Sequence, residues 1–327
     1  MSTPHSDSQQ TTIMDPAGAN APLLSSSEGT DAATPGKEKQ RERLAIIVSM
    51  FALYVIWGAT YLGMRDALQG FPPFLLAGIR FLVSGGLMFI FLLLRGAPLP
   101  TRKEWLGAAL IGAFLLVGGN GGVTFAEQWV PSGLTAVATG AVPLWAALFA
   151  GFFGRWPARR EWLGLALGFA GLILLNLGNG LSASWSTGTT VLLLSPIAWA
   201  FGSILSQRVA LPKGFMSTAA ELVCGGVMLL FIGLASGERM TAMPPMPAIW
   251  AMIFLIAAGT WIAYTAYGYL LSHVRASLAT SYAYVNPVVA VGLGVWLGGE
   301  QVTLLSAISM LIILSGVVLV TISRPSK

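Results

Sequence analysis

Long apolar runs, separated by short polar or proline-containing loops, dominate the chain from Leu44 onward. Each run is about 20 residues long, enough for a helix to cross roughly 30 Å of hydrocarbon at about 1.5 Å per residue. The expected spans are residues 44–63, 73–94, 105–126, 132–153, 161–178, 187–207, 216–235, 248–270, 276–297 and 303–322. The pattern therefore predicts an all-α membrane protein with ten transmembrane helices.

The composition supports a membrane environment and excludes several other classes. Of the 327 residues, 55% are hydrophobic and only 9% are charged, whereas soluble proteins carry roughly 25% charged residues. The single cysteine, Cys224, excludes a disulfide framework within one chain and a cysteine-based zinc site. We expect no cofactor and no metal. The net charge of +5 comes from basic residues scattered singly between apolar runs, so we expect no nucleic-acid partner.

The basic residues predict the orientation in the membrane. With the N-terminus inside, 15 of the 18 Lys and Arg residues fall in cytosolic segments, and only Arg65 and Arg239 fall in outer loops. The remaining one, Arg80, lies within the second span. Because an excess of Lys and Arg marks cytosolic loops, we expect a multi-pass protein of the plasma membrane with both termini in the cytosol.

The chain divides into a tail and two similar halves. Residues 1–43 are rich in Ser, Thr, Pro, Ala and Gly without an apolar period, which predicts a disordered cytosolic tail. Residues 44–180 and 187–322 form the halves, marked by the recurrence of Leu134, Pro143 and Gly154 as Leu278, Pro287 and Gly298, and of Trp57 as Trp199. Since each half holds five spans, an odd number, the second must be inverted, with the binding site between the copies.

Three stretches resemble a known family: WGATYLGMRDALQGFPPFLLAGIRFLVSGG (57–86), AEQWVPSGLTAV (126–137) and LATSYAYVNPVVAVGLGVWLGGE (278–300). They are similar to the EamA group of the drug/metabolite transporter superfamily, above all its YedA-like members in bacterial inner membranes. The resemblance implies ten helices in two inverted five-helix repeats. It also implies a central cavity between helices 1–4 and 6–9, with helices 5 and 10 outside, and small metabolites, often amino acids moving outward, as substrates.

Three charged residues within or near the spans are candidates for function. Arg80 either snorkels or makes a structural ion pair, or it holds a carboxylate or other anionic group of a substrate, because a buried charge needs a partner or water. Glu221 is its inverted counterpart near the cytosolic end of the seventh span, and is either a proton or amine site or the structural partner of a cytosolic Arg or Lys. Glu127, at the outer end of the third span, either takes part in transport or is a solvated residue at the helix end.

Aromatic and polar residues on the later spans suggest the walls of a site. Trp261, Tyr264, Thr265 and Gly268 fall at i, i+3, i+4 and i+7, and Leu278, Tyr282 and Asn286 at i, i+4 and i+8, so each set is expected to share a helix face. Ordinary packing and the interfacial belt are the alternative. Pro287 also frees the carbonyl near Ala283. The candidate substrate-binding residues are Trp57, Tyr61, Arg80, Asn120, Trp199, Tyr264, Tyr267, Tyr282 and Asn286, and the candidates for coupling or gating are Glu127, Glu221, Pro143 and Pro287.

Glycines have two interpretations. Small residues such as Gly164 and Gly168 predict close helix packing. The Gly-Gly-Asn-Gly-Gly cluster at 118–122 either does the same or loosens the third span for gating, with Asn120 facing the cavity.

The leading hypothesis is a secondary transporter that exports small metabolites by alternating access across the lipid bilayer. The sequence holds no P-loop, so we expect either a proton gradient acting through Glu221 or the substrate's own gradient to drive transport. A lipid flippase or scramblase with the same architecture is the first alternative. An intramembrane enzyme is the second, but the only histidines, His5 and His273, lie outside the spans, and no carboxylate pair lies within one span. The oligomeric state stays open.

Overall fold

The structure is a computed structural model that describes residues 35–129, 135, 138–177, 187–298 and 304–322. All regular secondary structure in these ranges is helical, which confirms the predicted fold class. In chain order the helices are α1 (Pro35–Ala67), α2 (Pro73–Leu94), α3 (Arg102–Gly112), η1 (Ala113–Gly121), α4 (Gly122–Ala126), α6 (Val142–Phe152), α7 (Arg159–Leu177), α8 (Thr187–Leu205), α9 (Phe215–Ala235), α10 (Met246–Phe254), η2 (Leu255–Ile262), α11 (Ala263–His273), α12 (Ala276–Ala279), α13 (Tyr282–Gly298) and α14 (Leu304–Ile322). Residues Met1–Gln40 form a unit separate from Arg41–Lys327, and the description below concerns the second unit.

Six helical stretches of the described residues are long and apolar enough to cross a membrane. They are Lys39–Ala67, Pro73–Leu94, Arg102–Ala126, Thr187–Leu205, Phe215–Ala235 and Met246–His273. Shorter apolar helices cover Val142–Phe152 and Ala307–Val320. The predicted span 132–153 lies partly outside the described residues. Helix α1 begins at Pro35, before the predicted tail boundary at residue 43, and residues 1–34 of that tail also lie outside the described ranges.

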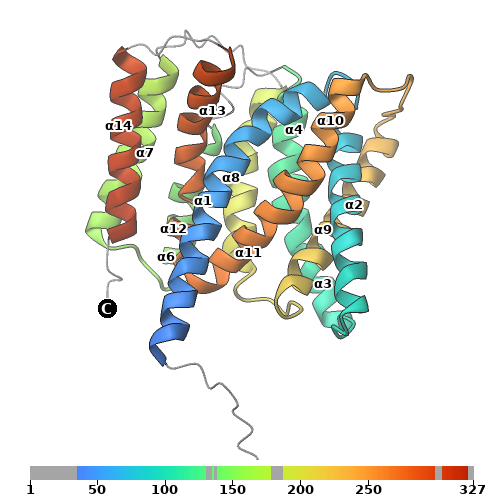
Figure 1. Cartoon of the computed structure of the whole chain (residues 1–327), viewed down its shortest axis with the longest axis horizontal. Helices are drawn as coiled ribbons and strands as arrows, with labels where there is room; N and C mark the ends of the chain where they lie inside the picture. The colour runs from blue at the N-terminus through green and yellow to red at the C-terminus, as the bar shows by residue number, and fades with distance from the viewer. Residues whose placement is uncertain (1–34, 130–134, 136–137, 178–186, 299–303, 323–327) are drawn as a thin grey trace, which may run out of the picture. The chain divides into compact units, whose positions relative to one another are not determined.

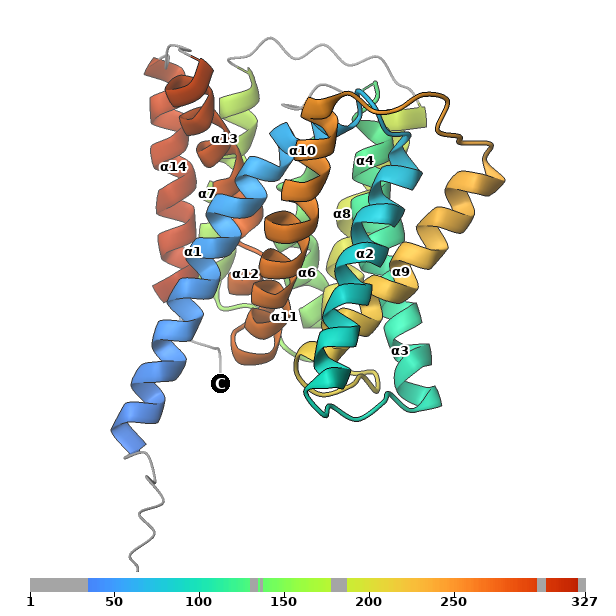
Figure 2. The ribbon, with the colours of Figure 1, turned by 45° about the vertical axis from the view of Figure 1, so that its right-hand side comes forward.

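Consecutive spans run in alternating directions through the bundle (Figures 1 and 2). Residue Arg41 in α1 and the last residue of α14 consequently lie at the same end. This end carries the loops 95–101, 153–158 and 206–214 and is called the basic end, because Arg95, Arg155 and Arg208 lie on it. An even number of membrane crossings is consistent with this arrangement. The orientation, with the basic end in the cytosol, stays a prediction.

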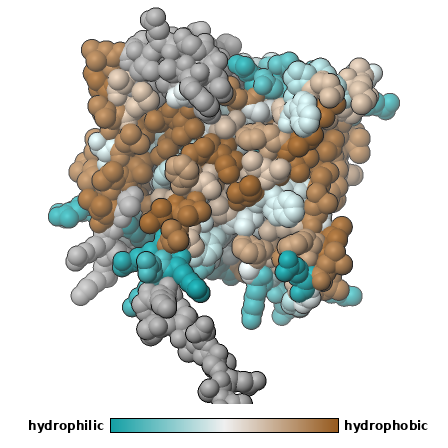
Figure 3. Space-filling model, viewed as in Figure 1, coloured by the Kyte–Doolittle hydropathy of each residue, from teal (hydrophilic) through white to brown (hydrophobic). Residues whose placement is uncertain are grey.

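The surface of the bundle is apolar at mid-height. Figure 3 shows hydrophobic residues across the middle of one face and hydrophilic residues toward its two ends. Large apolar side chains that are more than two-thirds exposed include Phe51, Phe231 and Leu106. Water would not tolerate such a continuous apolar face, whereas lipid tails solvate it without cost.

Helices α2 and α9 end in the same way, 141 positions apart. The amide of Gly96 donates to Leu93 O at 2.9 Å, and that of Gly237 donates to Leu234 O at 3.1 Å. Both glycines have φ near +85°, at +81° and +86°, a left-handed conformation that residues with a Cβ atom rarely adopt. The matched ends are what two repeats of one ancestral unit would produce.

The expected repeat partners pack directly on one another. Helix α2 crosses α9 at Gly85 and Gly226, where an added Cβ atom would lie 2.6 Å from Leu222 Cβ and from Leu82 N, respectively. Helices α7 and α14 cross at Gly164, where an added Cβ atom would lie only 2.8 Å from the carbonyl oxygen of Gly316. The small residues of α7 therefore permit close packing, as their spacing predicts.

Two wide-turn segments interrupt the third and eighth spans at corresponding places. η1 covers Ala113–Gly121 and η2 covers Leu255–Ile262, both as π-helix. Because a π turn holds an extra residue, it rotates the faces on either side of it. The expectation that Trp261 shares a face with Tyr264 is wrong for this reason, since Trp261 is 36% exposed and Tyr264 is 5% exposed.

The proline-marked spans are also less regular than expected. The ninth span is two helices, α12 and α13, joined by a turn at residues 280–281, and Pro287 lies inside α13. Pro143 is not in mid-helix, because α6 begins at Val142 and places it in the first turn. A first-turn proline costs little, since the amide there has no partner within the helix.

Candidate substrate-binding site

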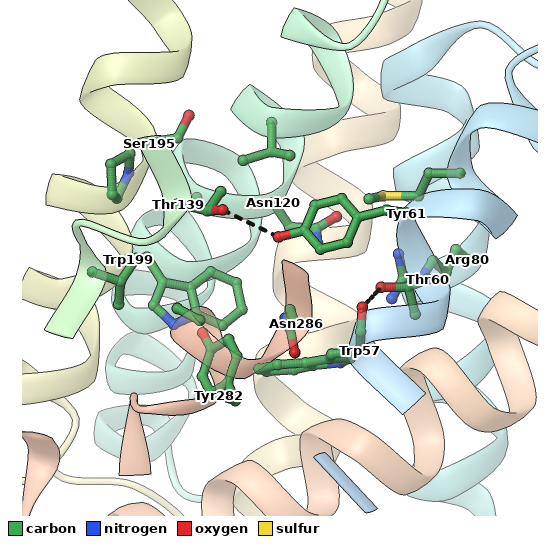
Figure 4. Close-up of a pocket in the computed structure, with 16 residues that line it drawn as sticks. Trp57, Thr60, Tyr61, Arg80, Asn120, Thr139, Ser195, Trp199, Tyr282 and Asn286 are labelled. Atoms are coloured by element: carbon green, nitrogen blue, oxygen red, sulfur yellow. Dashed lines mark hydrogen bonds between the residues drawn. The ribbon is translucent and has the colours of Figure 1, made fainter. Parts of the chain in front are cut away.

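A central pocket lies between the first and second halves of the chain, at the height of the two π segments. Its empty volume is about 550 Å³, including the part open to solvent. The residues around it come mainly from α1, α2, η1, α4, α6, α8 and α13 (Figure 4). The lining residues are Trp57, Thr60, Tyr61, Met64, Arg80, Gly119, Asn120, Val123, Thr139, Val142, Ser195, Pro196, Trp199, Tyr282, Ala283 and Asn286.

Five aromatic rings in mutual contact separate this pocket from a second cavity. The rings of Trp57, Trp199 and Tyr282 face the pocket, and those of Tyr264 and Tyr267 face the other cavity. The centroid of Trp57 lies 4.5 Å from that of Tyr282, 5.2 Å from that of Tyr264 and 5.6 Å from that of Trp199. We call these five residues the aromatic plug.

Hydrogen bonds fix the plug in place. Trp199 Nε1 donates to the Tyr267 hydroxyl at 3.0 Å, and this hydroxyl lies 2.6 Å from Ser203 Oγ. Because the Ser203 hydroxyl donates to Trp199 O, Tyr267 is the donor to Ser203. On the other side, Trp57 Nε1 donates to Gly259 O at 3.0 Å. The plug is therefore held by directional bonds as well as by ring contact.

The second cavity, called the vestibule, opens at the basic end. Its empty volume is about 2140 Å³, and it is lined by parts of α9 and α11 and by the loop 206–214. Glu221 lies on its wall, where Ser217 Oγ donates to its carboxylate at 2.8 Å. Of the residues that the structure describes, none lines both the pocket and the vestibule. The plug thus closes the pocket toward the basic end.

Arg80 is the buried cation of the pocket and is only 2% exposed. Its Nε donates to Thr260 Oγ1 at 2.6 Å, and its Nη2 donates to Gly259 O at 3.0 Å. Both acceptors belong to η2 and both are neutral. Within the described residues, Arg80 has no carboxylate at ion-pair distance and its Nη1 has no hydrogen-bond partner, so the charge of the guanidinium is uncompensated at close range.

The side of the pocket opposite the plug is polar. The Tyr61 hydroxyl lies 3.2 Å from Thr139 Oγ1, and the Thr139 hydroxyl itself donates to a backbone carbonyl. Asn286 is 2% exposed, and its Oδ1 has no hydrogen-bond partner among the described residues. Figure 4 shows the Tyr61 ring on the same side of the space as Asn120 and Thr139, whereas Asn286 lies next to Trp57 and Tyr282 of the plug.

The structure brings most of the predicted binding residues together. Trp57, Tyr61, Arg80, Asn120, Trp199, Tyr282 and Asn286 line the pocket. Tyr264 and Tyr267 do not; they line the vestibule, behind the rings of Trp57 and Trp199. The expectation that Leu278 shares a face with Tyr282 is also wrong, because the turn at 280–281 turns Leu278 toward the vestibule. Whether any of these residues binds substrate stays a prediction.

The coupling and gating candidates lie outside the pocket lining. Glu221 is in the vestibule wall, and Pro143 follows the lining residue Val142. Pro287 follows the lining residue Asn286 and removes the amide that would bond the carbonyl of Ala283, which also lines the pocket. Glu127 lies directly after α4, with both carboxylate oxygens buried and without partners among the described residues.

Sequence reasoning missed several polar lining residues. Thr60, Thr139 and Ser195 are part of the wall. Thr60 and Ser195 each stand one helical turn from a lining tryptophan, but small hydroxyl residues are common in membrane helices because they bond their own backbone, as both do here. Pattern alone gave no reason to choose them.

Comparison with known proteins identifies the family. The sequence matches the EamA-like transporter family over residues 44–177 and again over residues 186–322. The chain belongs to this family. It is 46% identical over 286 residues to the inner membrane transporter YedA of Escherichia coli strain K12, which covers 87% of this chain and 93% of that protein. The transporter YdfC of Bacillus subtilis strain 168 is 26% identical, over 85% of this chain and 91% of its own length.

A solved crystal structure shows the same fold. It superimposes with a TM-score of 0.71 at 20% sequence identity, over 85% of this chain and 98% of the other. The chain is therefore a multi-pass inner-membrane transporter with the ten-helix EamA fold. Among the described residues, the lining of the central pocket includes none from α7 or α14.

Proposed function

We propose that this EamA-family protein is a secondary transporter that exports small metabolites, amino acids above all, by alternating access. The proposal is carried by one observation. The central pocket holds a guanidinium that has no carboxylate at ion-pair distance in the described part of the chain, and the aromatic plug closes the pocket toward the basic end.

Arg80 selects an anionic group in this scheme. An arginine at mid-span costs a few kcal/mol even on lenient insertion scales. Here two of its nitrogens are held by η2, which fixes the plane of the guanidinium and leaves Nη1 available. A carboxylate arriving in the pocket would supply the missing opposite charge, and the planar fork suits its two oxygens. The substrate then rests against Trp57, Trp199 and Tyr282.

The plug is the inner gate in this scheme. The basic end faces the cytosol by the positive-inside rule. In the state described, the plug blocks the path from the vestibule to the pocket, so loading from the cytosol requires α1, α8 and α11 to move apart. Inverted repeats supply such a rocking motion around a fixed site. Protons are the proposed coupling ion, with Glu221 and Glu127 as the candidate carriers.

The test is transport by the purified full-length chain in liposomes loaded with radiolabelled amino acids, keto acids or amines. Wild-type protein should accelerate release of at least one of these solutes, and fluorescent lipids in parallel liposomes should not move faster. Arg80→Ala and Arg80→Lys should both lose at least about 90% of the rate, because a lysine lacks the bidentate fork. Normal transport by Arg80→Ala at normal abundance, or lipid movement without solute release, would overturn the proposal.

A further inference from the structure

The π segment η2 accepts hydrogen bonds from side chains of both α1 and α2 at one point. Trp57 Nε1 and Arg80 Nη2 both donate to the carbonyl oxygen of Gly259, each at 3.0 Å. Arg80 Nε also donates to Thr260 Oγ1 at 2.6 Å, and the Thr260 hydroxyl in turn donates to Leu255 O at 2.7 Å. One carbonyl therefore holds a ring of the aromatic plug and the buried cation of the pocket together.

The close approach of three helices at this carbonyl depends on the glycine. A Cβ atom added at Gly259 would lie 2.8 Å from Thr60 Cγ2 and 3.3 Å from Arg80 Nη2. One turn along α2, Ser84 Oγ donates to Ile256 O at 3.1 Å, so a second carbonyl of η2 also accepts a bond from this helix. Segments of π-helix are frequent at functional sites. Here the plug ring cannot leave without breaking its bond to the carbonyl that also holds Arg80.

Closure of the plug buries an uncompensated charge. Arg80 is 2% exposed and has no carboxylate at ion-pair distance in the described part of the chain. A buried charge without a counter-charge is costly, and an open plug would relieve this cost by admitting water from the vestibule. An anion on Arg80 relieves the same cost while the plug stays closed. The anion therefore binds the closed state more tightly, and a ligand shifts an equilibrium toward the state that it binds better.

We propose that η2 couples anion binding at Arg80 to closure of the aromatic plug, with Gly259 and Thr260 as positioning residues that do not contact the substrate. The inference rests on the proposed function, in which Arg80 holds an anionic group. Thr260 keeps the guanidinium beside the carbonyl that also binds Trp57, so compensation of the charge stabilises the closed arrangement of both donors. A substrate that enters from the vestibule thus favours closure of the plug behind it.

Plug opening can be measured at Ser203, which is fully buried and lines neither the pocket nor the vestibule. A solute in the pocket does not cover this residue directly, whereas its hydrogen-bond partner Tyr267 shields it as part of the plug. We use purified full-length protein with Cys224→Ser and Ser203→Cys, and measure the rate of labelling by a small thiol reagent. The probes are the amino acids and keto acids of the transport panel, and its amines serve as solutes without an anionic group.

A carboxylate that wild-type protein transports should slow the labelling of Ser203→Cys about tenfold, because the labelling rate follows the population of the open plug. The amines should leave this rate unchanged. Ser206→Cys is the matched control, since it lies in the open vestibule. It should be labelled at the same rate with and without the carboxylate.

Variants of Thr260 test the role of η2 in this response. Thr260→Val keeps the approximate size of the side chain and removes the oxygen that accepts from Arg80 Nε. The carboxylate should then slow labelling by less than about threefold, because one of the bonds that fix the guanidinium is lost. Thr260→Ser keeps the hydroxyl and should restore the full response. Thr265→Val, on the same span, is the control, since the Thr265 hydroxyl lies 4.0 Å from Met88 Sδ rather than at Arg80.

The outcomes separate the two proposals. Carboxylate transport that is lost in Arg80→Ala, without slower labelling of Ser203→Cys, would overturn the coupling and leave the proposed function intact. A full response to the carboxylate in Thr260→Val would also overturn the coupling. Absence of all solute transport by wild-type protein, or normal transport by Arg80→Ala, would overturn the proposed function itself.

Discussion

Arg80 in α2 and Glu221 in α9 occupy corresponding positions, 141 residues apart, on two helices that end in the same turn. Their surroundings differ in kind. Arg80 is bound to the backbone and side chain of η2 across the bundle, whereas the hydrogen bond of Glu221 comes from Ser217 of its own helix. Arg80 faces a small pocket, and Glu221 faces a vestibule about four times as large in empty volume.

The difference shows how a duplicated scaffold produces an asymmetric transporter. Both halves match the same family model, but the plug closes one cavity and leaves the other open at the basic end. A fixed cation in a closed space suits recognition, because its geometry is set before the substrate arrives. A carboxylate on the wall of a wide vestibule suits exchange with water and ions.

The largest expected effect concerns access to the two cavities. In a Cys224→Ser background, which removes the only native cysteine, we place one cysteine at Ser206 in the vestibule or at Thr139 in the pocket. In inside-out vesicles, a membrane-impermeable maleimide should label Ser206→Cys at least about 100-fold faster than Thr139→Cys. Equal rates would remove the plug as a barrier. If Ser206→Cys were labelled faster in right-side-out vesicles than in inside-out vesicles, the predicted orientation would be wrong.

The plug itself can be opened. Tyr267→Phe removes the bonds to Trp199 and Ser203 but keeps the ring. It should raise labelling of Thr139→Cys from the basic end by about tenfold, because two lost hydrogen bonds weaken the closed state by roughly 1–3 kcal/mol. Unchanged labelling, with transport also unchanged, would mean that ring packing alone holds the plug. The control is Tyr269→Phe, because Tyr269 lies on the same helix but outside the plug.

Neutralising Glu221 should cost less than losing Arg80. Glu221→Gln keeps the size of the side chain and the bond to Ser217, so we expect a loss of transport of no more than about tenfold. The measurement is the initial rate with and without an imposed proton gradient. If Glu221 carries the coupling proton, the variant loses its response to the gradient and keeps exchange of substrate for substrate. A loss equal to that of Arg80→Ala under both conditions would contradict the comparison.

The crossing of α2 and α9 gives a test of stability with its own control. At Gly85 an added Cβ atom would lie 2.6 Å from Leu222, whereas at the adjacent Gly86 it meets no atom within 4 Å. Gly85→Ala should destabilise the protein by about 1–3 kcal/mol through overpacking. Gly86→Ala should be neutral or slightly stabilising, because alanine favours helix. Thermal unfolding in detergent compares the two, and similar melting temperatures would mean that the helices do not cross so closely.

The smallest effect is expected for the tail. Deleting residues 1–34 keeps the whole of α1 and the basic residues from Lys37 onward, so transport should stay within about twofold of the wild type. The rate per molecule in liposomes is the measurement. A larger loss at equal abundance would give the tail a role in transport.

The sequence by itself determined the fold class, the number of spans and the residue types around the cavity. Apolar runs and the scarcity of charge are direct consequences of lipid as solvent, and they act along the chain without reference to its neighbours. A lone arginine within a span can also be recognised from sequence as a candidate functional residue, because burying its charge is costly. Trp57 and Trp199 could be matched from their similar positions in the two halves of the sequence, and the structure places their ring centroids 5.6 Å apart.

Only the tertiary structure decided which residues share a cavity. Periodicity arguments assume a rotation of about 100° per residue, and this fails where η1 and η2 widen the turn and where residues 280–281 break the ninth span. Trp261 therefore faces outward, and Tyr264 and Tyr267 lie on the vestibule side of the plug. The acceptors that bind Arg80 are likewise a carbonyl and a threonine of η2, 179 and 180 positions away. Such partners are set by how helices pack, a property of the assembled bundle that no single stretch of sequence contains.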